Sequence, residues 1–230
     1  ANLIFCFRKL NMKFVFREFD FPLMKEMTIF SSYIFMNMII DQINWNLDKF
    51  LLGRFRGTVA VAIYGLGAQL NSYYISLSSA VSSVFIPRVN RMVANNSSNQ
   101  KLTALFTRVG RVQFILLSLI STGFVFFGQP FIEMWAGTEY RETYYITLLL
   151  IIPVTIPLIQ NLGIEIQKAK NMHQFRSWVY FFIALGNLVL SIPLSKLYGG
   201  IGAATGTAIS LIIGNILIMN WYYHNKVGIN

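Results

Sequence analysis

Residues 41–49 read Asp-Gln-Ile-Asn-Trp-Asn-Leu-Asp-Lys and lie inside an apolar segment that runs from about residue 27 to residue 52. A segment of this length can cross a bilayer, which takes roughly 20 residues. A carboxylate near mid-bilayer costs about 2.5–3.5 kcal/mol, so it should face protein or water rather than lipid. On a helix, Asp41, Asn44 and Asp48 share one face. Two interpretations follow: a transport pathway, or structural carboxylates tied to neighbouring helices.

The composition indicates that the whole chain is a membrane protein. Of its 230 residues, 55% are hydrophobic and 12% are charged, whereas an average soluble domain is about 25% charged. Several apolar runs approach the length of a span, and no alternating strand pattern occurs. We therefore predict an all-α fold, a polytopic transmembrane helical bundle. In a membrane protein, the net charge of +10 indicates which connectors face the cytoplasm. We therefore expect no nucleic-acid partner. A single cysteine leaves no internal disulfide or cysteine-based metal site.

The hydrophobic pattern predicts a six-helix transmembrane lobe over residues 27–230, preceded by residues 1–26, which hold the end of an earlier span and a basic connector. The spans are expected at about 27–52, 58–86, 112–135, 143–166, 177–196 and 201–223. Lys and Arg gather in three connectors, which the positive-inside rule assigns to the cytoplasm. We expect Pro22 to start the first span and Pro87 to end the second, while Pro153 and Pro157 kink the fourth. The chain begins within an apolar run, so we expect a fragment.

Two helix faces carry regularly spaced small residues. In the second span these are Ser72, Ser76, Ser79 and Ser83, and in the last they are Gly202, Gly206, Ser210 and Gly214. The glycine-rich face predicts tight contact between helices. For the serine face, either packing or the lining of a cavity for a polyhydroxylated ligand is open. Glu165 lies close to Lys168 in sequence, which predicts a surface ion pair.

Motifs that would indicate an enzyme are weak in this chain. Residues 200–206 match a dinucleotide glycine pattern, but an apolar span precedes them and no acidic residue follows Glu165. The longest expected external loop is too short for the acidic and basic loop of a glycan assembly enzyme. We therefore expect a transporter, not an enzyme, with no organic cofactor.

Three stretches carry a resemblance to a known family. They are residues 43–53 (Ile-Asn-Trp-Asn-Leu-Asp-Lys-Phe-Leu-Leu-Gly), 59–65 (Val-Ala-Val-Ala-Ile-Tyr-Gly) and 85–91 (Phe-Ile-Pro-Arg-Val-Asn-Arg). They resemble the polysaccharide biosynthesis/transport (Wzx-type) flippases of the MATE-like superfamily. The resemblance covers nearly all of the chain by span order and is specific in residues 41–91. It implies one lobe of a two-lobed transporter, the C-terminal lobe, whose N-terminal lobe lies upstream.

The resemblance implies a flippase of the bacterial inner membrane that moves undecaprenyl-diphosphate-linked oligosaccharide, such as an O-antigen, capsule or exopolysaccharide unit, to the outer leaflet by alternating access. Expected partners are the lipid-linked oligosaccharide, membrane lipids and the missing N-terminal lobe. The expected cavity residues are Asn44, Trp45, Asn71, Tyr73, Tyr74 and Ser76. Arg88 and Arg91 either attract the diphosphate or simply follow the positive-inside rule. Alternatives are a drug/cation antiporter, a lipid II flippase, or a membrane-embedded glycan assembly enzyme.

Related lipid II flippases bind sodium in this lobe, so the resemblance also implies a coupling ion. The candidate residues for Na⁺ or H⁺ are Asp41, Asp48, Asn187, Ser191 and either Thr205 or Thr207. Among them we expect Asp41 to be essential and Ser191 to be dispensable. The last two spans hold no acidic residue, which departs from the family pattern and leaves the identity of the ion open.

Overall fold

The structure is a computed structural model that describes residues 20–170, 174–222 and 224. Inside the helices, the side chains of residues 37, 40, 41, 43–45 and 174 lie outside the described part. The chain divides into two units, residues 1–36 and residues 37–230. The expected end of an earlier span and most of the first basic connector fall in residues 1–19, which the structure does not describe.

The described part of the first unit is the beginning of helix α2 (Phe21–Phe55). The prediction that a helix starts at Pro22 is confirmed to within one residue, because proline is tolerated in a first turn. Asp20 Oδ1 accepts the backbone N–H of Leu23 at 3.1 Å and so satisfies one of the free donors at this end.

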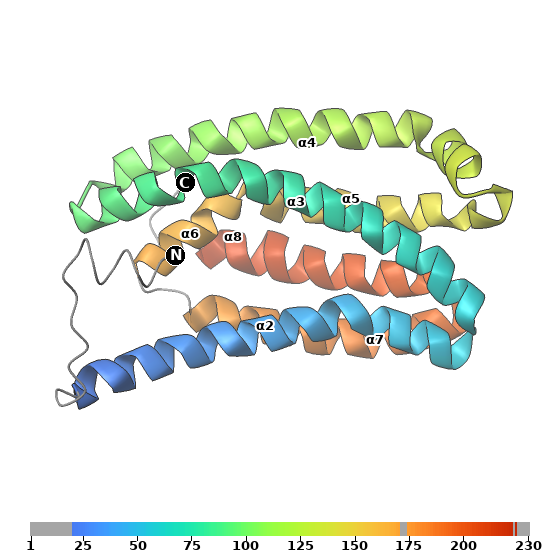
Figure 1. The fold of residues 1–230 in the computed structure, drawn as a ribbon, viewed down its shortest axis with the longest axis horizontal. Helices are drawn as coiled ribbons and strands as arrows, with labels where there is room; N and C mark the ends of the chain where they lie inside the picture. The colour runs from blue at the N-terminus through green and yellow to red at the C-terminus, as the bar shows by residue number, and fades with distance from the viewer. Residues whose placement is uncertain (1–19, 171–173, 223, 225–230) are drawn as a thin grey trace, which may run out of the picture. The chain divides into compact units, whose positions relative to one another are not determined.

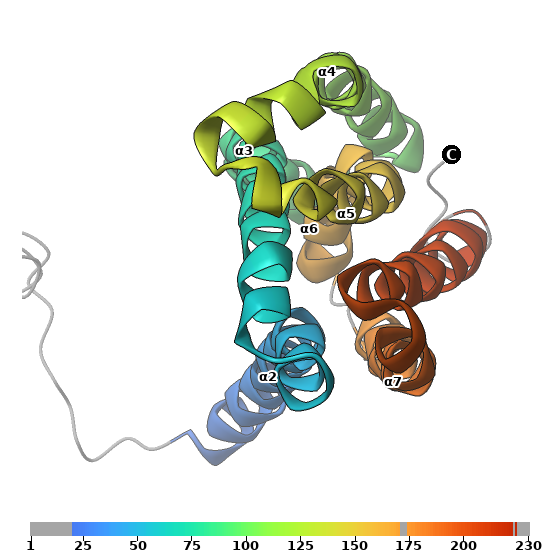
Figure 2. The same ribbon diagram turned by 90° about the vertical axis from the view of Figure 1, so that its right-hand side faces the viewer.

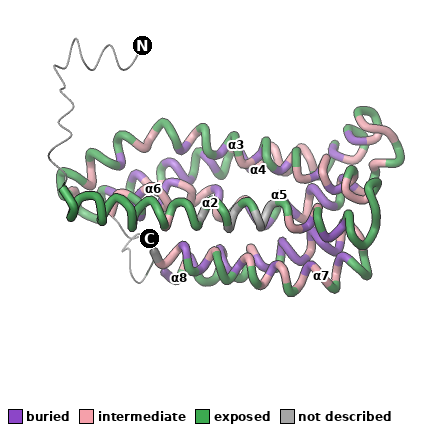
Figure 3. Tube along the Cα trace, turned by 60° about the horizontal axis from the view of Figure 1, so that its bottom comes forward, coloured by how far each residue is buried: buried purple, intermediate pink, exposed green. Residues whose placement is uncertain are grey.

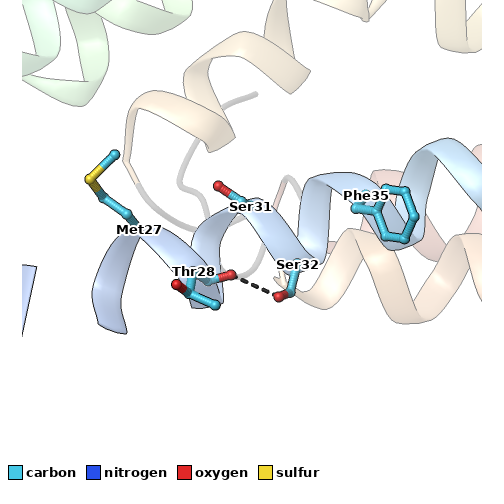
Figure 4. A pocket seen from close by; sticks show the side chains of 5 residues that line it. All are labelled: Met27, Thr28, Ser31, Ser32 and Phe35. Atoms are coloured by element: carbon cyan, nitrogen blue, oxygen red, sulfur yellow. Dashed lines mark hydrogen bonds between the residues drawn. The ribbon is translucent and has the colours of Figure 1, made fainter. Parts of the chain in front are cut away.

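A pocket of about 360 Å³ lies along this part of α2. Figure 4 shows the residues that line it, Met27, Thr28, Ser31, Ser32 and Phe35. The hydroxyl of Ser32 donates to the backbone carbonyl of Thr28 at 2.7 Å. Thr28 donates in the same way to the carbonyl of Met24 at 2.8 Å. Two of the pocket's hydroxyls are therefore satisfied by their own helix.

The second unit contains the rest of α2 and a set of long helices. These are α3 (Thr58–Ala94), α4 (Asn99–Trp135), α5 (Glu142–Ile159), α6 (Asn161–Ala169) and α7 (Gln174–Leu211), with the 3-10 turn η1 (Thr138–Tyr140) before α5. α7 continues through a π-helical segment, η2 (Ile212–Met219), into α8 (Asn220–Tyr222). Helix α5 packs against α3, α4 and α7 (Figures 1 and 2). The described residues form no strand, and the predicted all-α membrane bundle is confirmed.

Helix α7 consists of two halves that meet at Gly199, where the backbone leaves the helical region (φ 60°, ψ −134°). The halves pack closely, and the glycine-rich face of the second half lies at the contact. A Cβ atom on Gly206 would lie 2.6 Å from Ser191 Oγ, and one on Gly202 would overlap the carbonyl group of Leu194. The predicted tight contact along this face is therefore confirmed, because only a residue without a side chain fits at these two positions.

The surface of the second unit is strongly apolar. Exposed large side chains run along α4, for example Ile115 (69% exposed), Leu119 (72%) and Phe126 (72%). Figure 3 shows buried residues gathered between the helices and exposed ones along their outer sides. Within the described residues, three stretches are long and apolar enough to cross a membrane: Asn99–Trp135, Thr138–Ile159 and Phe175–Tyr222. The total of six spans stays a prediction.

The prediction that Pro87 ends a helix is wrong. Helix α3 runs through Pro87 to Ala94, and only residues 95–98 separate it from α4. Val89, just after the proline, is fully buried and belongs to one apolar cluster with Leu102 and Leu105 of α4. Packing of this extension therefore outweighs the one backbone hydrogen bond that proline removes.

The predicted disruption near Pro153 and Pro157 is a helix break at Gln160, between α5 and α6. The carbonyl of Leu158, next to the break, accepts the hydroxyl of Ser78 at 3.1 Å. Gln113 of α4 donates to Ser78 Oγ at 3.1 Å, so one polar contact links α3, α4 and α5. Beyond the break, the predicted surface ion pair is confirmed, because Lys168 Nζ lies 2.9 Å from Glu165 Oε1.

Candidate functional site

The centre of the candidate site is Asp48, near the end of α2. Its side chain is buried, with 1% of its area exposed. Tyr64 of α3 donates a hydrogen bond to Asp48 Oδ2 at 2.5 Å, and Thr207 of α7 donates to the same oxygen at 2.6 Å. The other oxygen, Oδ1, is buried and accepts no hydrogen bond from the described residues. One carboxylate oxygen is thus held in place while the other is left available.

Two residues of the first half of α7 extend this site. Ser191 donates to Asn187 Oδ1 at 2.7 Å, and the hydroxyl of Thr207 lies 3.2 Å from the same amide oxygen. Asn187 is 2% exposed and Ser191 is fully buried. We call Asp48, Tyr64, Asn187, Ser191 and Thr207 the Asp48 cluster; it joins α2, α3 and both halves of α7.

The local fold explains why these side chains meet. Helices α2 and α3 are joined by a short turn at residues 56–57, and Asp48 and Tyr64 stand eight residues on either side of Arg56. In a helical hairpin, residues equally far from the turn lie at the same depth. On α7, Gly206 brings the second half within contact distance of Ser191, so that Thr207 reaches the carboxylate.

An apolar layer borders the Asp48 cluster. It consists of the buried residues Leu52, Tyr64, Ile146, Leu150, Ala203 and Ala204. Tyr64 belongs to both groups, with its ring in the layer and its hydroxyl on Asp48. The layer keeps the carboxylate away from solvent, and low polarity strengthens the interaction of a carboxylate with any cation that reaches it.

The chemistry of the Asp48 cluster follows from its atoms, since a carboxylate, an amide carbonyl and three hydroxyls all offer oxygen. Hard cations prefer oxygen ligands. A buried polar atom without a partner costs about 1–3 kcal/mol. Within the cluster, binding of a cation or a proton is therefore most favourable at Asp48 Oδ1. The residues present therefore fit a small monovalent cation or a proton.

The structure brings together four of the five residues predicted for ion coupling. Asp48, Asn187, Ser191 and Thr207 lie in one cluster. The side chain of Asp41, which was expected to be essential, lies outside the described residues. Of the two alternative threonines, Thr205 instead donates to the carbonyl of Ile201 at 2.8 Å.

Tyr64 was not singled out by sequence reasoning. It occurs in the stretch 59–65 that carries the family resemblance, but an apolar context gives a tyrosine no evident role. The signal that identifies it is its position relative to the turn, at the same depth as Asp48. That signal depends on knowing that α2 and α3 form a hairpin.

The residues predicted to line a substrate cavity do not form one group. Asn71 is fully buried, and neither polar atom of its amide has a hydrogen-bond partner among the described residues. Tyr74 is 2% exposed, and its hydroxyl lies 2.7 Å from Thr155 Oγ1 of α5; it packs between helices instead of lining an open cavity. Tyr73 is 60% exposed, and Ser76 is also exposed. The side chains of residues 44 and 45 are not described.

The serine face of α3 lies on the surface of the second unit. Ser72, Ser76, Ser79 and Ser83 are all exposed, as is Gln69 one turn earlier. The hydroxyl of Ser76 donates to the carbonyl of Ser72 at 2.8 Å, within its own helix. These serines therefore lie on the surface of this unit, and packing and the lining of a cavity both stay predictions.

Arg88 and Arg91, the predicted diphosphate residues, are exposed near the end of α3. They follow Tyr64 by 24 and 27 residues, which corresponds to roughly 36–40 Å along a helix. They are therefore not part of the Asp48 cluster and lie at the opposite end of α3.

Comparison with known proteins supports the resemblance. A family model described as "Polysaccharide biosynthesis protein" matches residues 2–145. The protein named "Probable flippase AglR" of Haloferax volcanii is 25% identical over 176 residues, which is 74% of this chain and 36% of that protein. The chain thus spans about a third of the length of the curated relative that it matches. No solved structure matches the chain.

The family match includes α2, α3, α4 and therefore two residues of the Asp48 cluster, Asp48 and Tyr64. It covers more than half of the sequence and agrees with the helical, apolar architecture. The chain belongs to the polysaccharide biosynthesis protein family.

Proposed function

We propose that this chain is one lobe of a flippase that moves a lipid-linked oligosaccharide across the cytoplasmic membrane, and that uptake of a cation at the Asp48 cluster drives the movement. The observation that carries the proposal is the buried carboxylate of Asp48, with one oxygen held by two hydroxyls and the other without a partner among the described residues. Ionisable residues inside membrane helices are functional sites by default, because their burial is costly.

The position of the Asp48 cluster suits coupling. Its side chains come from α2, α3 and both halves of α7, so an ion bound there holds these elements together. A ligand shifts a conformational equilibrium only through its different affinity for the two states. A cation bound by Asp48 Oδ1 and Asn187 Oδ1 stabilises the state described here and is released from a state in which α2 and α7 separate. Na⁺ and H⁺ both fit this scheme.

The exposed face of α3 supports an uncharged, polyhydroxylated substrate. Its serine hydroxyls and the amide of Gln69 offer donors and acceptors without a formal charge. A cavity for a cationic drug would instead need carboxylates, and the buried Asp48 is shielded from this surface. Arg88 and Arg91, at the cytoplasmic end of the same helix, would meet the diphosphate as the substrate enters. The prenyl chain would stay in lipid, and an upstream lobe would complete the pathway by alternating access.

The experiment uses the full-length gene in a bacterial strain that lacks its own oligosaccharide flippase, and it measures the leaflet in which undecaprenyl-linked oligosaccharide accumulates. We expect the wild-type protein to deliver it to the outer leaflet and Asp48→Asn to lose delivery. The matched control is Glu165→Gln, an acid-to-amide change at a surface ion pair, which should retain delivery.

Two outcomes would contradict this proposal. If Asp48→Asn transports at the wild-type rate, the cluster does not couple transport. If the wild-type protein leaves several different oligosaccharides in the inner leaflet, the substrate class is wrong; transport of lipid II or of a cationic drug, measured in the same membranes, then identifies the alternative. Replacing external Na⁺ with choline at constant pH separates sodium coupling, which would fail, from proton coupling, which would persist.

A further inference from the structure

A pocket of about 430 Å³ opens at the end of the second unit where α2 turns into α3. Its lining residues include Arg56 of that turn, Val59 and Ile63 of α3, Glu142 of α5, and Leu197 and Gly199 of α7. Figure 2 looks onto this end. The positive-inside rule assigns it to the outside, because the basic residues between α3 and α4 and at the end of α6 lie at the opposite end of this unit.

Arg56 holds two sides of this pocket together. Its Nη2 donates to the backbone carbonyls of Lys196 at 2.7 Å and Leu197 at 2.9 Å. These carbonyls stand at the end of the first half of α7, where the break at Gly199 removes their helical donors. One guanidinium therefore caps that half-helix and ties it to the turn between α2 and α3.

The pocket adjoins the apolar layer that borders the Asp48 cluster. Ile63 lines the pocket and packs against this layer, and the next residue is Tyr64, whose hydroxyl reaches Asp48. Leu52, a member of the layer, stands four residues from Asp48 and four from Arg56. The pocket is thus separated from the cluster by roughly two helical turns, or about 12 Å, and the same helices border both.

We propose that this pocket is the external opening through which a small cation reaches the Asp48 cluster, and that Arg56 closes it. This inference rests on the proposed cation coupling. The partly buried carboxylate of Glu142 attracts cations into the pocket. While Arg56 binds the α7 carbonyls, its charge repels cations and its hydrogen bonds hold the helices together, as arginines do at selective constrictions in channels. Release of Arg56 removes both barriers.

The test measures access to the apolar layer in the full-length protein. The native cysteines are replaced, one cysteine is introduced at Ala204, which is fully buried, and sealed right-side-out vesicles receive a membrane-impermeant maleimide. We expect slow labelling with Arg56 intact. Arg56→Gln should raise the rate by roughly tenfold or more, because a hydrogen bond to a charged group changes an equilibrium by about one to two powers of ten.

Two controls keep this test decisive. Arg54→Gln removes an exposed cation of the same helix end that does not line the pocket, and it should leave the rate unchanged. A cysteine at Val59, which is 70% exposed at the pocket, should react quickly in every variant and so report both folding and sidedness. Equal labelling of Ala204→Cys with Arg56→Gln and with Arg54→Gln would overturn the inference, and so would a Val59→Cys that is unreactive from outside.

A further variant separates the hydrogen bonds of Arg56 from its charge. Arg56→Lys keeps the charge without the planar guanidinium, and it should label at a rate between those of the wild type and Arg56→Gln. The assay needs neither substrate nor a coupling ion. If the labelling results contradict the external opening, the proposed coupling at Asp48 can still be tested by Asp48→Asn transport. If Asp48→Asn transports normally, the proposed coupling is wrong, and the pocket then has no cation to admit even when labelling behaves as expected.

Discussion

The phenolic oxygen of Tyr64 lies 2.5 Å from Asp48 Oδ2, and it donates the hydrogen bond that fixes the carboxylate from the α3 side. The hydroxyl of Thr207 reaches the same oxygen from α7. Because both donors bind Oδ2, the carboxylate cannot rotate without breaking two hydrogen bonds. The position of Oδ1 is therefore fixed as well. A site prepared in this way before the ion arrives needs little rearrangement on binding.

Tyr64→Phe should weaken binding of the coupling cation by about tenfold, since a hydrogen bond to a charged group contributes roughly 1.5–3 kcal/mol. The ring stays, so the apolar layer should remain packed. The measurement is the cation-dependent rise in the thermal unfolding temperature of the purified full-length protein. The matched control is Tyr74→Phe, whose hydroxyl instead contacts Thr155; it should keep the cation response. A wild-type response in Tyr64→Phe would remove this role.

Thr207→Val should also reduce the cation response, because it removes the second donor to Asp48 and leaves a side chain of similar size. Thr205→Val, two residues earlier, removes only a hydroxyl that bonds to its own helix, and its cation titration should match that of the wild type. If both variants lose the response equally, a general defect of this helix explains the effect, and the threonine at 207 has no special part.

Gly206→Ala should destabilise the protein by about 1–3 kcal/mol, the usual cost of overpacking. The added Cβ atom would lie 2.6 Å from Ser191 Oγ and 3.0 Å from its backbone nitrogen. The control is Gly123→Ala on α4, where no described atom outside the adjoining backbone lies within 4 Å of an added Cβ and where helix propensity favours alanine. Denaturant or thermal unfolding should separate the two variants, and equal stability would show that the halves of α7 can move apart freely.

Ser79→Trp should reduce oligosaccharide delivery to the outer leaflet while leaving thermal stability close to that of the wild type. Ser79 is exposed on the serine face of α3, so a bulky ring there fills the proposed pathway without disturbing the packing of this unit. Leu119→Trp on the outer side of α4, where the leucine is 72% exposed, is the matched control and should transport normally. Normal delivery by both variants would exclude the serine face from the pathway.

The sequence predicted much of the fold because hydrophobic periodicity and glycine signal it directly. The start of α2 at Pro22, the end of α4 at residue 135 and the break between residues 196 and 201 were all predicted. The end of α3 and the start of α4 were not, since basic residues end a hydrophobic window without ending a helix. Val89 and Leu102 pack these extensions against each other. This is a tertiary contact between two helices, so a local sequence pattern does not predict it.

The candidate site shows a similar division. A family resemblance implied one coupling group of Asp41, Asp48, Asn187, Ser191 and either Thr205 or Thr207. The structure brings four of these together, although they are up to 159 residues apart. Tyr64 was not predicted, because its role depends on how α3 is positioned along α2, and the sequence alone does not reveal this. The importance of Asp41 was inferred from the cost of a mid-bilayer charge, and it stays a prediction.

The change of direction at Gly199 sets the length of the two halves of α7. Without it, the 48 residues of Phe175–Tyr222 would form one rod of about 70 Å, more than twice the roughly 30 Å thickness of the hydrocarbon core. With it, each half is about 35 Å long, close to the thickness of that core. Because a φ of 60° is costly for any residue with a side chain, one glycine divides a segment too long for a bilayer into two halves of matching length.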